Sequence, residues 1–573
     1  MNNFNDYYNY LNNYNDMNFM TNPNTMITDM NYQNMFPNNY TIPNTNTNSS
    51  ITDSQIGFKR GNLFNNLYSM FNKHPKGLIA AALANLGERF GFYTMMAILV
   101  LFLQAKFGMN GKEAGFIYST FYFSIYILAL VGGIIADKTR NYKGTIFTGI
   151  VLMAVGYLLL AIPSKTPVDN KMLYLVITCA SLFVIAFGNG LFKGNLQALV
   201  GQMYDNPQYA NMRDSGFSLF YMFINIGAIF APFAAVGVRN WWLSTFGYNY
   251  DADLPALCHG QLAGTLSPEA TETYHTLVTK ASTAPVQDYT AFASDYLNVF
   301  TTGFHYAFGV AIIAMAISLT IYWLNKKNFP DPSKKTVASS ASSTVVEMSA
   351  QEVKQRMYAL FAVFGVVIFF WFSFHQNGLT LTYFAKEYTD LNLFGMPISA
   401  ELFQSLNPFF VVFLTPVIMA IFASQRRRGK EPSTPKKIAI GMGIAALAFI
   451  VMAVGSYFAN LPLHEDIVAV GTSPVKVTPF LLMLTYLILT VAELYISPLG
   501  ISFVSKVAPP KYQGIMQGGW LGATALGNQL LVIGAILYES IPIWMTWTVF
   551  VVACTISMFT MIFMLKWLER VAK

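Results

Sequence analysis

Residues 85–93 read Asn85-Leu86-Gly87-Glu88-Arg89-Phe90-Gly91-Phe92-Tyr93, and this stretch decides how the rest of the chain is interpreted. It lies inside an apolar run, from about 77 to 103, that is long enough to cross a lipid bilayer. A Glu-Arg pair at that depth is costly. It either lines a polar cavity on a substrate or proton path or joins helices as a structural ion pair. Lys193, His375 and Glu493 also fall within long apolar segments, so we predict one shared polar site.

Composition indicates a multi-spanning membrane protein. Hydrophobic residues make up 54% of the 573 positions and charged residues only 11%, whereas soluble proteins carry about 25% charged residues. The apolar spans expected from the sequence are about 77–103, 114–136, 143–162, 172–197, 215–236, 301–324, 356–381, 402–424, 437–459, 478–504, 514–538 and 541–566. We therefore predict an all-α membrane protein with twelve transmembrane helices in two six-helix halves, the layout of a carrier with the major facilitator fold.

The expected domain boundaries follow changes in composition. Residues 1–72 form an Asn-rich extension that we expect to be disordered, because it has too few apolar side chains to build a core. It contains no apolar signal-peptide segment, and Met70 resembles a plausible true start. We expect the first half over 73–324, a cytoplasmic linker over 325–355 and the second half over 356–573. An insertion over 237–300 interrupts the first half, either as a folded cap or as a tolerated surface loop.

The Lys and Arg residues indicate the orientation. Most of the 35 lie in loops and ends on one side of the predicted bilayer, and the positive-inside rule makes that side cytoplasmic. Both termini would then be cytoplasmic, in a plasma membrane (the inner membrane of a bacterium). This distribution explains the basic character without a nucleic-acid partner. The sequence has no metal-ligand spacing, phosphate-binding loop or nucleophile elbow, so we expect no cofactor, no metal and no enzymatic activity.

The buried charges suit a ligand whose own charges are separated. Arg89 and Lys193 are cations, whereas Glu88 and Glu493 are anions. The two cations would hold a carboxylate and Glu493 an ammonium, as a short peptide requires, because charge-assisted contacts are strong in a desolvated cavity. Tyr93 shares a helix face with Arg89 through its i,i+4 spacing. Polar-capable side chains inside other spans are Tyr126, Asn225, Asn407 and Trp520.

Six motifs follow one another along the spans. The first is Glu88-Arg89-Phe90-Gly91-Phe92-Tyr93. The others are Gly132-Gly133-Ile134-Ile135-Ala136-Asp137, Gly188-Asn189-Gly190-Leu191-Phe192-Lys193-Gly194-Asn195, Phe220-Tyr221-Met222-Phe223-Ile224-Asn225-Ile226-Gly227, Gln404-Ser405-Leu406-Asn407-Pro408 and Glu493-Leu494-Tyr495-Ile496-Ser497-Pro498-Leu499-Gly500. Their order and content resemble the proton-coupled oligopeptide transporter family of the major facilitator superfamily. The resemblance runs from about residue 73 to the C-terminus, except in 237–300 and 325–355.

This resemblance implies import of di- and tripeptides with protons, by alternating access across the bilayer. The residues implied to bind substrate are Arg89, Tyr93, Tyr126, Lys193, Asn225, Asn407, Glu493, Ser497 and Trp520. The residues implied to couple transport to protons are Glu88, Lys193 and His375. The proton gradient would be the energy source.

Three positions depart from the family pattern. Asn85 stands where the family's E-x-x-E-R-F-x-Y-Y motif begins with Glu, and Phe92 replaces the first Tyr of its closing pair. On the seventh span, His375 stands where a Glu is usual. A membrane histidine can carry a proton, so His375 either replaces that Glu as coupling group or stays neutral and hydrogen-bonded.

Two alternative functions remain open. With fewer carboxylates, the cavity would also accept nitrate or another small anion, although Glu493 favours an ammonium. A non-transporting peptide sensor on the same fold would explain the missing carboxylates, although the surviving cavity charges and the lack of an attached signalling domain oppose it. Fold resemblance alone does not fix function.

Overall fold

The computed structural model describes residues 74–204, 206, 208–209, 213–330, 348–509 and 512–572. Within these residues, twelve helical spans are long and apolar enough to cross a membrane. Each overlaps one of the spans predicted from hydropathy, and several extend beyond the predicted bounds. The predicted disorder of residues 1–72 and the central part of the linker, 331–347, lie outside the described residues.

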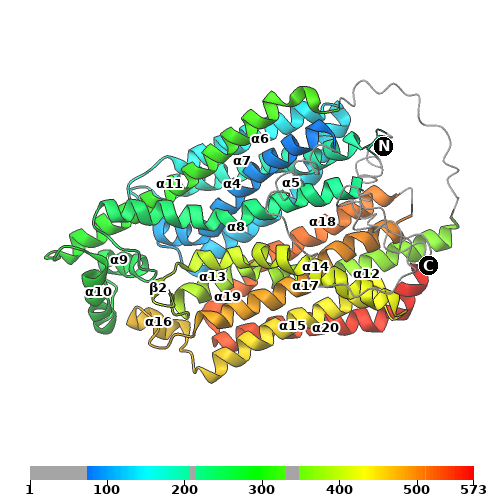
Figure 1. The fold of residues 1–573 in the computed structure, drawn as a ribbon. Helices are drawn as coiled ribbons and strands as arrows, with labels where there is room; N and C mark the ends of the chain where they lie inside the picture. Colours follow the sequence, from blue (N-terminus) through cyan, green and yellow to red (C-terminus); the bar gives the residue numbers. More distant parts are fainter. Residues whose placement is uncertain are drawn as a thin grey trace, which may run out of the picture.

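The spans form two bundles that lie side by side (Figure 1). The first bundle contains α4 (Lys76–Phe107), α5 (Gly111–Thr139), α6 (Tyr142–Ala161), α7 (Lys171–Met203), α8 (Arg213–Thr245) and α11 (Tyr289–Leu324). The second contains α12 (Ala350–Phe374) continued by η5 (His375–Gly378) and α13 (Thr380–Glu387), η6 (Ala400–Ser405) with α14 (Leu406–Arg427), α15 (Thr434–Phe458), α17 (Pro479–Val507), α18 (Gln513–Gln529) with α19 (Leu531–Ser540), and α20 (Ile543–Val571). Two spans of the second bundle are therefore interrupted, the one from α12 to α13 and the one from α18 to α19, and a third begins with the 3-10 segment η6.

The two bundles have corresponding internal packing. In the first, its third span α6 packs against its fourth and sixth spans, α7 and α11; in the second, the third span α15 packs against the fourth and sixth, α17 and α20. The bundles meet where α5 contacts α18 and α19, and where α8 contacts α14. Within the first bundle, Gly132 lies so close to the Gly190 carbonyl that no side chain would fit there. Glycine at these positions lets α5 and α7 approach closely, as expected for helices packed in lipid.

One end of the molecule carries the short elements, and we call it the cap end (Figure 1). They are α9 (Leu254–Ala263), α10 (Pro268–Ala281), the hairpin of β1 (Asn392–Leu393) and β2 (Met396–Pro397), and α16 (His464–Val470). The short 3-10 helix η3 (Lys326–Asn328) lies at the other end. In the hairpin, Asn392 pairs with Pro397 and Leu393 with Met396. The opposite end, where α20 finishes and η3 lies, is called the terminal end.

The insertion in the first half is shorter than predicted. Helix α8 continues to Thr245 and α11 already begins at Tyr289, so only residues 246–288 leave the bundle rather than 237–300. The hydropathy pattern missed these helical turns because they extend beyond the apolar runs. The segment is a folded cap, and it contacts the second half: Thr472 donates a 2.6 Å hydrogen bond to Asp253, and Ser267 donates one of 2.5 Å to the Ala469 carbonyl.

Candidate functional site

Glu88 and Arg89 form a buried ion pair in the middle of α4. Arg89 Nε lies 2.5 Å from Glu88 Oε2, and Arg89 Nη2 lies 2.6 Å from Glu88 Oε1. On the neighbouring helix α7, Asn189 Nδ2 donates a third hydrogen bond, of 2.7 Å, to Glu88 Oε1. Because the pair balances its own charge, it contributes little net charge to its surroundings. The pair also joins α4 to α7 through Asn189. A structural role for the pair is therefore compatible with a place in a polar site.

Lys193, on α7, is the second cation of this site. Among the described residues, no carboxylate oxygen lies within the 4.0 Å of an ion pair from its Nζ, which is 5.0 Å from the centre of the Tyr126 ring. Lys193 interacts electrostatically with Arg89 and Glu88 of α4. It also interacts electrostatically with His375 in the second half. Lys193 therefore presents an uncompensated positive charge between the two halves.

Glu493 is the corresponding anion on the second half. It lies in the middle of α17, where Asn407 of α14 donates a 2.8 Å hydrogen bond to its Oε2. Asn407 also donates to Thr490, at 3.1 Å, one turn earlier on α17. These partners are neutral and leave the carboxylate's charge in place. Tyr93 and Tyr126, on the first half, lie within electrostatic reach of both Arg89 and Glu493.

His375 occupies the point where the seventh span is interrupted. Helix α12 ends at the preceding residue, and the 3-10 segment η5 begins at His375. Its Nδ1 lies 2.5 Å from Asn528 Oδ1, one residue before the end of α18. The ring centre is 4.8 Å from that of Trp371 and 4.7 Å from that of Tyr122, across the bundle interface. Interrupted helices are a recurrent feature of transporter binding sites, since they supply polar groups at membrane depth.

Three predicted site residues are not joined to these charges by direct bonds. Asn225 donates to the Tyr221 carbonyl of its own helix, at 3.1 Å. Trp520 is buried and packs tightly against Gly500 of α17. Ser497 is half-buried one turn after Glu493, and its side chain makes no hydrogen bond within the described part of the chain. Their roles in binding stay predictions.

The sequence interpretation missed the neutral side chains that hold the charged ones. They are Tyr122, Asn189, Thr490 and Asn528. Asn189 lies within one of the six motifs, but no role was predicted for its side chain. Asn528 lies within an apolar run, where a buried amide requires a partner, and this was a usable signal. Among the described residues, no group of three or more His, Cys, Asp or Glu side chains is arranged to hold a metal ion.

Twelve membrane-crossing helices in two bundles define a multi-pass membrane protein of the major facilitator type. The same fold occurs in a crystal structure of the peptide transporter POT in complex with sulfate, which is 23% identical and has a TM-score of 0.65. The alignment covers 87% of this chain and 96% of that one. A POT family transporter in complex with 5-aminolevulinic acid gives a TM-score of 0.63 at 21% identity, covering 87% of this chain and 97% of the other.

The chain belongs to the POT family, whose family model matches residues 143–350 and 333–546. It is 28% identical to a peptide transporter of Yersinia enterocolitica over 475 residues, which are 80% of this chain and 87% of that protein. It is 27% identical to dipeptide and tripeptide permease A of Erwinia pyrifoliae over 463 residues, 79% of this chain and 84% of the relative. The family resemblance derived from the six motifs is thereby confirmed.

Proposed function

We propose that this protein is a secondary active transporter that imports di- and tripeptides together with protons, and that it is not an enzyme. The observation that carries the proposal is the position of Lys193 and Glu493 on opposite halves. Neither is neutralised by an oppositely charged side chain within ion-pair distance in the described residues. A peptide with free ends has a matching separation of charge. The names of the relatives from Yersinia and Erwinia support the same class of substrate.

In this proposal, Lys193 binds the peptide carboxylate and Glu493 binds the ammonium end, with Asn407 orienting Glu493. The Arg89 guanidinium is already engaged by Glu88, so its share in binding the carboxylate would require that pair to open. Charge-assisted hydrogen bonds to both ends fix the constant part of every peptide, whatever its side chains. The remaining walls of the pocket are assigned to Tyr93, Tyr126, Asn225, Ser497 and Trp520.

Proton coupling is assigned to His375, Glu88 and Lys193. In this assignment His375 Nδ1 donates to Asn528 Oδ1 across their short contact, and Nε2 accepts the transported proton. Protonation would place a second positive charge within reach of Lys193. Repulsion between the two cations would weaken the hold of Lys193 on the carboxylate. Glu88 is already paired with Arg89, and its share in coupling would require that pair to open.

Alternating access would come from rocking of the halves, residues 73–324 against 356–573, around the central site. We place the terminal end in the cytoplasm on the basis of the positive-inside rule, and expect both chain termini on that side of the membrane. The cap end then faces outward, in a plasma membrane. The energy would come from the proton gradient, without a prosthetic group.

One observation favours a second candidate. A cation without a carboxylate partner, as Lys193 is among the described residues, would also bind nitrate or another small anion. Glu493 opposes this candidate, because an unneutralised carboxylate in the same cavity repels anions.

Uptake of dialanine into proteoliposomes tests the proposal. We expect accumulation above equilibrium only with an inward proton gradient, and no competition from nitrate. Uptake that merely equilibrates would remove proton coupling and leave a facilitator. Nitrate movement without dialanine uptake would replace the proposal by the second candidate.

A further inference from the structure

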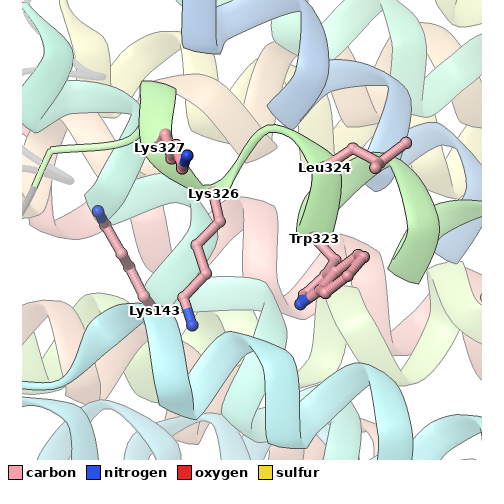
Figure 2. Close-up of a pocket in the computed structure, with 5 residues that line it drawn as sticks. All are labelled: Lys143, Trp323, Leu324, Lys326 and Lys327. Carbon is pink, nitrogen blue, oxygen red and sulfur yellow. The ribbon is translucent and has the colours of Figure 1, made fainter.

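A cavity of about 520 Å³ lies at the terminal end of the first bundle. It is lined by Lys143, Trp323, Leu324, Lys326 and Lys327. Figure 2 shows the three lysines on one side of the cavity, with Trp323 and Leu324 on the other. Of the described lining residues three are lysines and none is acidic, and Lys326 and Lys327 of η3 are both exposed. An anion is therefore the complementary ligand.

The cavity is held between the start of one membrane span and the end of another. Lys143 lies in the first turn of α6, and Trp323 and Leu324 end α11. Between these ends, the fully buried Tyr322 donates a 3.1 Å hydrogen bond to the Lys143 carbonyl. The same ring stacks on Phe329, with 5.0 Å between ring centres. These contacts fix the segments that carry the lysines, although the segments are far apart in sequence.

The apolar side of the cavity indicates what kind of anion fits. Trp323 is 61% exposed and Leu324 is 68% exposed, at the point where α11 leaves the membrane. Tryptophan favours the boundary between headgroups and acyl chains, and lysine stems lie along apolar surface while their ammonium groups stay in the polar layer. A free phosphate ion would use the lysines only. A phospholipid would use the lysines and also cover the two apolar side chains.

We propose that this cavity binds the headgroup phosphate of an anionic phospholipid, whose acyl chains lie along Trp323 and Leu324. Basic pockets at the ends of transmembrane helices attract such headgroups, and the attraction grows with each lysine near the surface. The site is separate from the central charges on α4, α7 and α17. Lipid binding at this cavity can therefore be tested independently of peptide transport.

Native mass spectrometry of purified protein with added phosphatidylglycerol or phosphatidylcholine tests the site. We expect tighter binding of phosphatidylglycerol, and loss of that preference in the triple variant Lys143→Gln, Lys326→Gln, Lys327→Gln. Each juxtamembrane lysine strengthens anionic-lipid binding by roughly fivefold, so the triple change should weaken it by more than about tenfold. The matched control replaces the exposed Lys430, Lys436 and Lys566, which lie at the same end of the second bundle, by Gln. It removes the same charge and should keep the preference.

Three results would overturn the proposal. They are equal affinity of the wild type for the two lipids, an equal loss of preference in both triple variants, and displacement of phosphatidylglycerol by millimolar inorganic phosphate. The last would assign the cavity to a soluble anion instead.

A second measurement does not depend on the folding of the triple variant. Phosphatidylglycerol with brominated acyl chains should quench the fluorescence of Trp323 in the wild type, and Trp323→Phe should remove that part of the quenching. Unchanged quenching in Trp323→Phe would place the lipid elsewhere.

Discussion

Arg239 of α8 and Glu401 of η6 form an ion pair in which both side chains are fully buried, and this pair joins the two halves near the cap end. Arg239 also donates a 3.0 Å hydrogen bond to Ser399, and its guanidinium lies 4.0 Å from the centre of the Tyr250 ring. Each charge has lost its water, and Arg239 donates two further hydrogen bonds, of 3.1 and 3.0 Å, to Asn240 Oδ1. The cap end is therefore closed by an interaction that is costly to break one partner at a time.

Glu401→Ala is expected to lower the melting temperature of the purified protein substantially. It leaves the Arg239 charge buried without its carboxylate, and breaking one side of a buried pair costs about 3–5 kcal/mol. Thermal unfolding followed by scattering or fluorescence measures the effect. The control is the double variant Arg239→Met, Glu401→Met, which removes both charges and should recover most of the lost stability. A single variant as stable as the wild type would show that the pair does not hold the halves together.

Glu493→Ala should weaken transport of peptides with a free amino terminus by roughly tenfold or more. Such a change removes a charge-assisted hydrogen bond, which contributes about 1.5–3 kcal/mol. Competition assays against dialanine and N-acetyl-dialanine in proteoliposomes compare the two kinds of ligand. The acetylated peptide has no ammonium group and should lose little affinity. Equal losses for both peptides would remove Glu493 from the ammonium site.

Lys193→Ala is expected to reduce gradient-driven dialanine uptake to background, because Lys193 is the uncompensated cation facing the second half. The matched control is Lys171→Ala, on the same helix but exposed at its first residue. That variant should transport normally. Normal transport by Lys193→Ala, with correct insertion shown by surface labelling, would rule out its role in binding and coupling.

His375→Gln should flatten the pH dependence of uptake if His375 carries the transported proton. Asn528→Ala should shift that profile without abolishing transport, because it frees the imidazole from the bond at Nδ1. The control is His305→Gln, since His305 is a buried histidine that contacts the Leu160 carbonyl within the first bundle. If His375→Gln kept the wild-type profile, Glu88 would become the main candidate for coupling.

Hydropathy predicted the membrane spans well for a physical reason. A helix satisfies its own backbone hydrogen bonds and can therefore cross lipid, where its side chains are mostly apolar. Each span consequently appears in the sequence as one long apolar run. Ionisable residues within those runs are rare and costly, and Glu88, Lys193, His375 and Glu493 therefore stood out. In the structure, Glu88 interacts electrostatically with Lys193. Lys193 interacts with His375, and Glu493 interacts with Tyr93, in both cases across the two halves.

What the sequence did not predict are contacts between residues distant in the chain. Asn528 holds His375 from 153 positions away, and Asn189 holds Glu88 from 101 positions away. Arg239 was placed in a polar loop because it follows an apolar run, yet it is fully buried. Such partners are set by helix packing and helix breaks, neither of which has a local sequence pattern.

His464 on α16 lies beside two carboxylates, and we expect this arrangement to make the stability of the protein depend on pH. Its Nδ1 lies 3.4 Å from Glu387 Oε2 and its Nε2 lies 3.8 Å from Glu539 Oε1. Burial by itself lowers the pKa of His464, but contact with Glu387 and the charge of Glu539 outweigh it, so the pKa of His464 is raised. Lys386 acts against this change, and Lys112 of the first half lies 4.0 Å from Glu539.

A raised native pKa means that the folded protein binds the proton more tightly than the unfolded chain. The stabilisation is fully present below the ordinary histidine pKa of about 6.5 and is lost as pH rises through the raised value. Melting temperatures of the wild type and His464→Gln should therefore differ most in acid and converge in base. In a Glu387→Gln background, the His464→Gln difference should shrink, because the main partner is neutral. A difference between wild type and His464→Gln that stays constant from pH 5 to pH 9 would contradict the assignment.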